Sequence, residues 1–189
     1  MTQFIFQYIG DWYDQYTIFA VVTPPGNTCS RAQYGEFENG TISVFNSGTN
    51  PDGSFDEVCG WAEQADPENA PGDLIVYFYG NPGDYWILDT DFTSFSSVYS
   101  CTTIGLARYE LAFILTRDRF PSNETVTCIA IVEFFIHNIH NTFQLEKAFD
   151  AFNRNNLELD WYPIVQFDDC VNDPPGNCKE EEDFYPSEE

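Results

Sequence analysis

The chain has 189 residues, a length that one antiparallel β-barrel can use without dividing into two domains. Its 31 acidic and 7 basic residues give a formal net charge of −24, which excludes a nucleic-acid interface because phosphate binding needs clusters of lysine and arginine. The same charge disfavours anionic membranes, and no apolar run approaches the roughly 18 residues of a spanning helix. We interpret the charge as a solubility feature, with a cationic partner as the alternative. Aromatic residues make up 17% of the chain, which favours strands and apolar pockets.

Six cysteines occur together with two N-glycosylation sequons, which begin at Asn39 and Asn123. This combination predicts a secreted, extracellular glycoprotein with disulfide bonds. The cysteine spacings include no Cys-x-x-Cys, and the two histidines, His137 and His140, are too few to hold a metal ion. We therefore expect no metal site.

Strand-like runs alternate with turn signals from the N-terminus to residue 116. Pro-Pro-Gly-Asn at 24–27 ends the first run, Asn-Gly at 39–40 separates the second from the third, and a Gly-Asn-Pro-Gly-Asp turn occupies 80–84. Eight short strands at hairpin spacing predict an all-β domain, either an up-and-down barrel or a sandwich. The expected strands are residues 12–22, 29–37, 41–45, 55–62, 74–79, 85–89, 96–103 and 109–116.

The pattern changes after Arg117. Ser122 can cap a helix, but residues 124–139 are rich in β-branched and aromatic side chains and are compatible with a helix or a strand. A helix is predicted over residues 145–153, because four apolar side chains recur there at helical spacing.

The C-terminal region contains one more strand-like run at residues 161–167. The final residues, 179–189, form an acidic run that we expect to be a disordered tail. The remaining chain, residues 1–178, is predicted to be a single domain.

Three islands of this sequence resemble the three motifs of the lipocalins. The first is Gly-Asp-Trp-Tyr at 10–13, the second is Thr-Asp at 90–91 followed by Phe95, where tyrosine is usual, and the third is Arg117. Within that family the chain looks like the group that includes apolipoprotein D, insect bilin-binding proteins and crustacyanin subunits. The likeness covers residues 8–170.

This resemblance implies a fold and two structural residues. The fold is an eight-stranded antiparallel up-and-down calyx barrel with a C-terminal helix or helices. Trp12 is implied to plug the closed end of the barrel, with the Arg117 guanidinium on the face of its ring as a cation–π contact. Both residues are therefore expected to be structural and not catalytic.

The resemblance also implies the disulfide pairs. Cys29 opens the second strand, where relatives form a bridge to the terminal cysteine, here Cys170. Cys128 is the implied partner of Cys101, as in crustacyanin-type chains. The third bridge is then left to the two remaining cysteines, Cys59 and Cys178.

A barrel of eight strands is wide enough for one small ligand, and strand residues alternate between its inside and its outside. The resemblance to apolipoprotein D places Leu74, Val76 and Phe78 on the inner face of their strand. Any one of the inner residues could instead fill a dry core. The expected ligand-binding residues, from the resemblance and from alternation, are Tyr16, Tyr34, Phe78, Tyr85, Ile87, Leu111 and Phe113.

The function that this resemblance implies is extracellular binding of a hydrophobic small molecule in the barrel. We expect a non-covalent chromophore for coloration, either a carotenoid such as astaxanthin or a linear tetrapyrrole of the biliverdin type. Association with copies of itself or with related lipocalins is compatible with this function. The inner aromatic side chains would stack on a flat conjugated ligand, and tyrosine hydroxyls or buried waters would satisfy its polar ends.

Two other binding functions remain open. One is a general carrier of lipids, retinoids, steroids or odorants. The other is sequestration of a cationic amine, which would need inward-facing acidic side chains, with Glu63, Asp89 and Glu110 as the candidates. An enzyme is not expected, because all six cysteines can pair and no Ser-His-Asp spacing supports nucleophilic catalysis.

Overall fold

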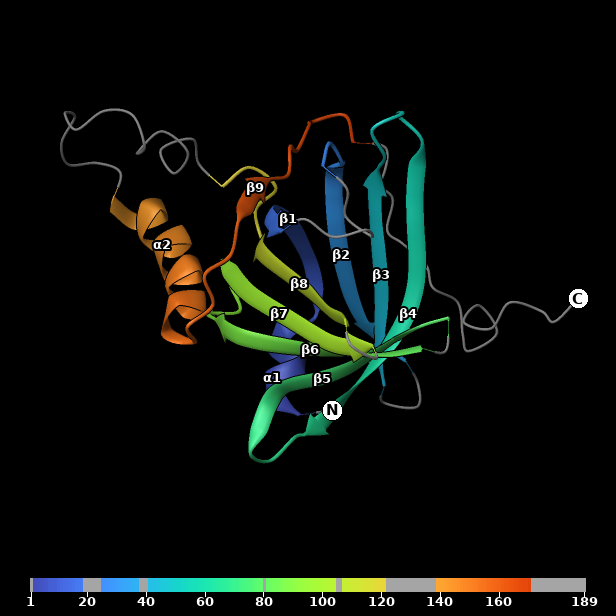
Figure 1. Cartoon of the computed structure of the whole chain (residues 1–189), viewed down its shortest axis with the longest axis vertical. Coiled ribbons are helices and arrows are strands. Elements are labelled where there is room, and N and C mark those ends of the chain that lie inside the picture. The colour runs from blue at the N-terminus through green and yellow to red at the C-terminus, as the bar shows by residue number, and fades with distance from the viewer. Residues whose placement is uncertain are drawn as a thin grey trace, which may run out of the picture.

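The structure, a computed structural model, describes residues 2–18, 25–37, 41–79, 81–104, 107–121 and 139–170 (Figure 1). Side chains are additionally left undescribed at 81, 103–104, 107–108 and 139–144. The helices are α1 (Gln3–Tyr8) and α2 (Ile139–Arg154). The strands are β1 (Gly10–Ile18), β2 (Thr28–Glu36), β3 (Ile42–Thr49), β4 (Phe55–Asp66), β5 (Ala70–Phe78), β6 (Asn81–Thr90), β7 (Phe95–Ile104), β8 (Ala107–Thr116) and β9 (Trp161–Pro163).

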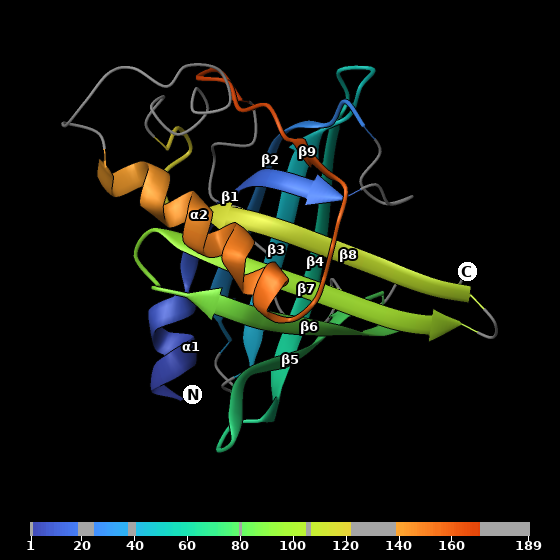
Figure 2. The same ribbon diagram turned by 60° about the vertical axis from the view of Figure 1, so that its left-hand side comes forward.

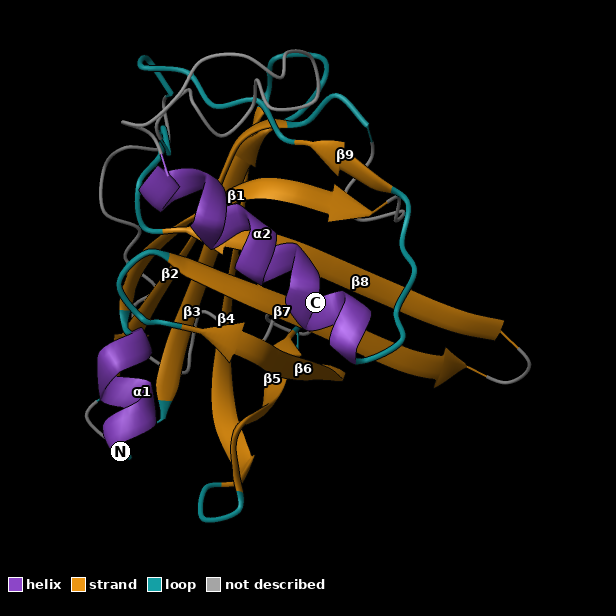
Figure 3. Ribbon diagram, turned by 90° about the vertical axis from the view of Figure 1, so that its left-hand side faces the viewer, coloured by secondary structure: helices purple, strands orange, loops and turns teal. Residues whose placement is uncertain are grey.

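The first eight strands form a closed antiparallel barrel, which confirms the expected fold. Each strand from β2 to β8 pairs with the next, β8 pairs with β1, and β1 pairs with β2 to close the ring. The short strand β9 adds to the outer side of β1, as Figure 3 shows. β1 pairs with β2 over Gly10–Tyr13, and β9 covers the same edge of β1 at Tyr16–Ile18, where β2 has moved away.

Two hairpins are tighter than the sequence suggested. Between the expected strands 41–45 and 55–62, β3 continues to Thr49 and pairs there with β4. The loop expected at 66–73 is only a short turn, in which the Asp66 carboxylate accepts hydrogen bonds from the backbone and side chain of Asn69. Such side-chain acceptors let a short polar turn replace a longer loop.

The barrel has one apolar core inside and a second one outside. The inner core gathers buried side chains from α1 and from the inward faces of the strands. The outer core lies between α2 and the strands β6, β7 and β8, on whose outer face the helix rests (Figure 2). The helix includes the predicted run 145–153, and its buried face carries Leu145, Ala148, Ala151 and Phe152.

A β-bulge in β1 changes which residues face the barrel interior. The register of β1 against β8 shifts between Asp14 and Tyr16. Trp12 and Asp14 therefore point inward, but Tyr16 is paired with the outward-facing Ile114 and belongs to the outer core. Simple alternation from Trp12 fails here because a bulge inserts one extra residue into the strand.

Cys29 and Cys170 form a disulfide with a Cα–Cα distance of 5.6 Å, which ties the segment after β9 to the start of β2. Cys59 is also disulfide-bonded, to a partner that lies outside the described residues. Cys128, the expected partner of Cys101, lies outside them as well. The same holds for Cys178, the sequon residues Asn39 and Asn123, and the acidic run 179–189.

Within the described ranges, neither helix has the length and apolar character that a membrane crossing would require.

Candidate ligand site in the barrel

Trp12 and Arg117 close one end of the barrel. Trp12 is 0% exposed, and its indole Nε1 donates a hydrogen bond to the carbonyl oxygen of Tyr8 at 2.9 Å. The guanidinium carbon of Arg117 lies 3.8 Å from the centroid of the Trp12 ring, which is cation–π geometry. The Arg117 guanidinium also donates to four carbonyl oxygens, those of Gln7, Tyr8, Asp11 and Phe92. This side chain therefore joins α1, β1 and the β6–β7 turn.

Gly10 makes this close approach possible. Its φ angle of +110° is a backbone conformation that side chains with a Cβ atom rarely adopt. A Cβ atom at this position would also lie 3.0 Å from Nη1 of Arg117. The glycine of the first motif is thus required by the arginine of the third.

Four hydroxyl groups form a hydrogen-bonded chain directly above this closed end. The Tyr8 hydroxyl lies 2.8 Å from Oγ of Ser96 and 3.4 Å from the hydroxyl of Tyr85. Tyr85 in turn lies 2.7 Å from the hydroxyl of Tyr34. Burial raises the pKa of Tyr8 to about 12 against the lowering effect of its hydrogen bonds to Ser96 and Tyr85. Burial also raises the pKa of Tyr34 and of Tyr85 well above the usual range, so all three phenols stay protonated.

In the opposite, open half of the barrel, fewer inward positions carry a side chain. The pairing register shows which side chains face inward there, because Val44, Val76 and Leu115 belong to the inner core and alternate positions share their face. Three of these inward positions carry no side chain: Gly48, Gly60 and Gly83. They lie toward the strand ends that lead to the turn at 50–54 and to Tyr79.

A buried polar group on the inner wall has no hydrogen-bond partner among the described residues. The Oδ1 atom of Asn46 is buried, and no described residue provides it with a hydrogen bond. Asn46 shares the inward face of β3 with Ile42 and Val44. A buried amide oxygen of this kind is costly unless water or a ligand supplies a donor.

Five of the seven predicted ligand-binding residues come together in or against the inner core. Tyr34 is buried within it, and Phe78, Tyr85, Ile87 and Phe113 pack against it. Leu111 shares the inward face of β8 with Phe113. The seventh residue, Tyr16, does not face the interior. Its ring contacts that of Phe149 in α2 on the outside of the barrel, with ring centroids 5.1 Å apart. The prediction for Tyr16 is therefore wrong, because of the bulge in β1.

The comparisons with known proteins agree with this geometry. A family model described as a lipocalin-like domain matches residues 5–133. The chain belongs to the lipocalin family. It is 37% identical to apolipoprotein D of Rattus norvegicus over 129 residues, which is 67% of this chain and 67% of that protein. The match to the Lazarillo protein of Schistocerca americana is 33% identical over 123 residues, 63% of this chain and 58% of that protein.

Solved structures show the same fold at lower identity. Lobster apocrustacyanin A1 has a TM-score of 0.63 and 19% identity, and the alignment covers 87% of this chain and 81% of that one. Insecticyanin of Manduca sexta has a TM-score of 0.58 and 16% identity over 97% of this chain and 84% of that one. These two likenesses concern the fold alone.

The three acidic residues that were candidates for a cationic-amine site point outward in this lipocalin. Glu63 accepts a hydrogen bond from Tyr77 on the outer face of β4 and β5, and Asp89 forms a salt bridge with Arg154 of α2. Glu110 accepts a hydrogen bond from Tyr99, which belongs to the outer core. None of these three carboxylates lines the barrel interior.

Asp14 is the inward-facing carboxylate that the sequence analysis missed. It is 8% exposed, lies two residues after Trp12 on the inward face of β1, and accepts a hydrogen bond from the Ser30 hydroxyl. Burial raises its pKa from 3.8 to about 6, with the Ser30 hydrogen bond acting in the opposite direction. The alternation from Trp12 that wrongly included Tyr16 would have found Asp14.

Tyr8 and Ser96 were also missed as parts of the barrel interior. Tyr8 belongs to α1, whose six residues are too few for a helical period to be recognised in the sequence. Ser96 is fully buried at the start of β7, where a small polar residue carries no distinctive sequence signal.

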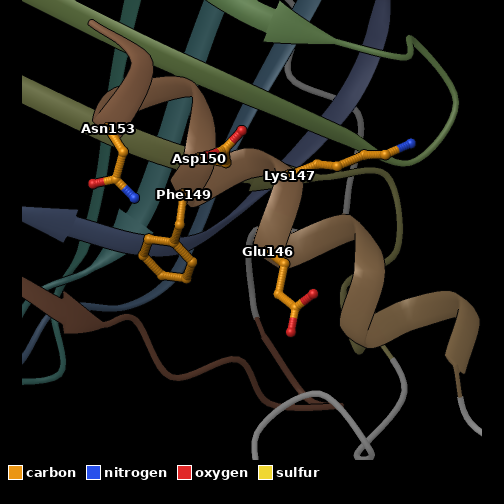
Figure 4. A pocket seen from close by; sticks show the side chains of 5 residues that line it. All are labelled: Glu146, Lys147, Phe149, Asp150 and Asn153. Carbon is orange, nitrogen blue, oxygen red and sulfur yellow. The ribbon is translucent and has the colours of Figure 1, made fainter. Parts of the chain in front are cut away.

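A hollow also lies on the outside of this lipocalin, along α2 (Figure 4). It is lined by Glu146, Lys147, Phe149, Asp150 and Asn153, and only one of these side chains is apolar. Figure 4 shows Glu146, Phe149 and Asn153 pointing to the same side of the helix. This open, charged surface does not suit a hydrophobic ligand.

Proposed function

We propose that this lipocalin is an extracellular binding protein that holds one hydrophobic small molecule, non-covalently, in the open half of its barrel. The observation that carries this proposal is the unequal filling of the inner wall. The closed end is filled by Trp12, Tyr8 and their neighbours, whereas Gly48 and Gly83 face inward toward the open end, where an added Cβ atom would meet no atom closer than 3.6 Å. Ligand sites are concave and mostly apolar, and such a wall has that character.

The side chains around these glycines fit an extended, flat molecule. Phe78, Leu111 and Phe113 share inward faces in this half, and aromatic faces contribute dispersion and stacking to a conjugated ligand. The buried Asn46 Oδ1 is an acceptor suited to a donor on the ligand or to a bridging water. A largely apolar wall with few polar groups can orient a ligand without charged contacts.

Within this class we propose a chromophore, either a carotenoid or a linear tetrapyrrole. The resemblance to the group with bilin-binding proteins and crustacyanin subunits supports that choice. An extracellular location is supported by the Cys29–Cys170 disulfide, since such bonds persist in oxidising compartments. A general carrier of lipids, retinoids, steroids or odorants is the alternative. The other alternative, sequestration of a cationic amine, is not supported by its three candidate carboxylates, because Glu63, Asp89 and Glu110 face outward.

An absorption experiment tests the proposal. Natively purified protein, and recombinant protein incubated with biliverdin or astaxanthin, should show a visible band that co-elutes with the protein. Phe113→Asp should abolish retention, because a buried unpaired charge costs more than a ring contact contributes. Phe120→Asp adds the same charge at a phenylalanine that is 51% exposed, and should keep the colour.

Three outcomes count against parts of this proposal. A folded Phe113→Asp protein that retains pigment would refute the placement of the site. A wild type that binds retinol or a fatty acid but neither pigment would favour the general carrier. A wild type that binds none of these apolar probes would refute the binding function.

A further inference from the structure

The inner wall contains one glycine whose missing side chain decides where an aromatic ring lies. Gly60 on β4 pairs with Phe78 on β5, and both residues face the barrel interior. A Cβ atom at Gly60 would lie 2.6 Å from both Cδ1 and Cε1 of the Phe78 ring. Non-bonded carbon atoms prefer a separation of about 3.5 to 4.0 Å, so the ring occupies the volume that any other residue would fill.

The other inward glycines of the open half do not have this relation. A Cβ atom at Gly83 would meet only the carbonyl oxygen of Val76, at 3.9 Å. At Gly48 the nearest atoms would be the carbonyl oxygen of Thr28 and the Cα atom of Ser30, at 3.6 and 3.7 Å. Both positions could accept an alanine in ordinary contact. Gly60 is thus distinguished by the ring that lies across it.

We infer that Gly60 is a specificity-determining position, which sets the width of the ligand site by letting Phe78 lie against the wall of β4. This inference rests on the proposed function. With a side chain at position 60, the Phe78 ring must leave β4 and swing into the interior beside β6, where the inner surface at Gly83 is open. The site then becomes narrower at its open half. Wide ligands such as tetrapyrroles lose affinity, whereas a slim chain does not.

The experiment compares two probes of different width, biliverdin and the fluorescent fatty acid cis-parinaric acid. Gly60→Ala should weaken biliverdin binding by about tenfold or more, since one methyl group in a filled apolar pocket has an effect of that order. Binding of cis-parinaric acid should change by less than about threefold, the range of a neutral substitution. Equal weakening of both probes, or of neither, would overturn the inference.

A double-mutant cycle with Phe78 separates displacement of the ring from the added methyl group itself. In a Phe78→Ala background the ring is absent, so Gly60→Ala should change biliverdin affinity by less than about threefold. An unreduced effect of Gly60→Ala in that background would show that the ring has no part in it. Gly83→Ala adds a methyl group to the same inner surface without meeting Phe78, and its effect on biliverdin should be the smaller one.

Gly35→Ala is the control for an added methyl group outside the site. Gly35 faces outward on β2, and its Cβ atom would lie 2.5 Å from the Ser43 hydroxyl oxygen, an equally close contact. It should bind both probes like the wild type. If Gly35→Ala selectively loses biliverdin, general barrel strain and not the width at Phe78 is responsible.

Folding of the variants is also informative, because a Cβ atom at Gly60 would lie 2.5 Å from the Tyr77 carbonyl oxygen. If Gly60→Ala fails to fold and Gly60→Ala/Phe78→Ala folds, the ring is the cause and the inference stands. If both fail, the backbone contact requires the glycine and the inference falls. A further measurement needs no ligand: the chemical shifts of the Gly60 Hα protons should change in Phe78→Ala, because the ring current of Phe78 is lost. An unchanged Gly60 signal would refute the ring contact.

Binding by the wild type keeps the two proposals apart. Wild type that binds neither biliverdin nor cis-parinaric acid refutes the ligand site, and with it the role of Gly60. Wild type that binds both, with Gly60→Ala indistinguishable from it, refutes only the role of Gly60.

Discussion

The two ends of the barrel are built from the same strands but filled in different ways. The closed end is a continuous network: Trp12 is fully buried, Arg117 bonds four carbonyl oxygens, and Tyr8, Tyr34 and Tyr85 share hydrogen bonds. In the open half, glycines face inward and the Oδ1 atom of Asn46 finds no partner among the described residues. The comparison suggests that stability is concentrated at the closed end, which leaves the open half free to vary in shape. Substitutions of equal size at the two ends should therefore have unequal effects.

The largest expected effect is that of Trp12→Ala. Loss of this fully buried ring should reduce the free energy of unfolding by about 4 kcal/mol, because the cavity would be surrounded by residues that cannot collapse into it. Phe113→Ala, in the open half, removes a ring that is only partly buried and should cost about half as much. Urea denaturation followed by circular dichroism measures the free energy of unfolding of both variants. Equal losses would mean that the open half is packed as a dry core.

Asp14→Asn should act in the opposite direction. The folded-state pKa of Asp14 is about 6 and its ordinary value is 3.8, so between these pH values the folded protein holds a proton that the unfolded chain has lost. The group therefore lowers stability as pH rises through 6, by at most about 3 kcal/mol at pH 7. Asparagine keeps a hydrogen-bonding partner for Ser30 without the buried charge, and should raise stability at pH 7.

The pH range of the Asp14 measurement matters. The pKa values of Asp52, Asp66 and Asp91 are lowered in the folded protein. Their contribution to the stability of the protein is therefore lost only as the pH falls through and below their ordinary pKa values near 4. Chemical denaturation at pH 7 and pH 5 isolates Asp14, and the advantage of Asp14→Asn should shrink at the lower pH. Asp84→Asn removes an exposed carboxylate and controls for net charge. An advantage that stays constant with pH would contradict the buried titration.

Arg117→Ala should cost about 2 kcal/mol. The variant loses the contact with the Trp12 ring and leaves the carbonyl oxygens of Gln7, Tyr8, Asp11 and Phe92 without this donor. Arg119→Ala is the matched comparison, because Arg119 lies over the Tyr13 ring at a longer 4.7 Å and bonds the carbonyl oxygen of Phe167. Its smaller loss, below about 1 kcal/mol, follows from the longer distance to its ring. If thermal melting ranks the two in reverse, Arg117 does not hold the closed end together.

Sequence reasoning predicted an all-β domain because strand-like runs and turn residues are local signals, and the resemblance to the lipocalins chose the barrel over the sandwich. The resemblance to apolipoprotein D places Phe78, Tyr85 and Phe113 on the inward faces of β5, β6 and β8, where the structure has them. Alternation along the same strands then adds Ile87 and Leu111. Tyr16 was misplaced because a bulge depends on how β1 meets β8, which no local pattern records. The importance of Gly60 is likewise invisible in the sequence, since it arises from the cross-strand pairing with Phe78.

The smallest expected effect is that of Tyr85→Phe, which tests the hydroxyl chain at the closed end. The Tyr85 hydroxyl lies between two other members, 2.7 Å from that of Tyr34 and 3.4 Å from that of Tyr8. Removing it leaves the buried Tyr34 hydroxyl without this partner, and the free energy of unfolding should fall by about 1 kcal/mol. Tyr77→Phe makes the same change on the outer face of β5, where the hydroxyl donates to Glu63 at the exposed surface, and should cost little. Urea denaturation of the two variants at pH 7 gives the difference directly. If Tyr85→Phe is as stable as Tyr77→Phe, the hydroxyl chain adds nothing to the closed end, and the contrast between the two ends of the barrel rests on Trp12 and Arg117 alone.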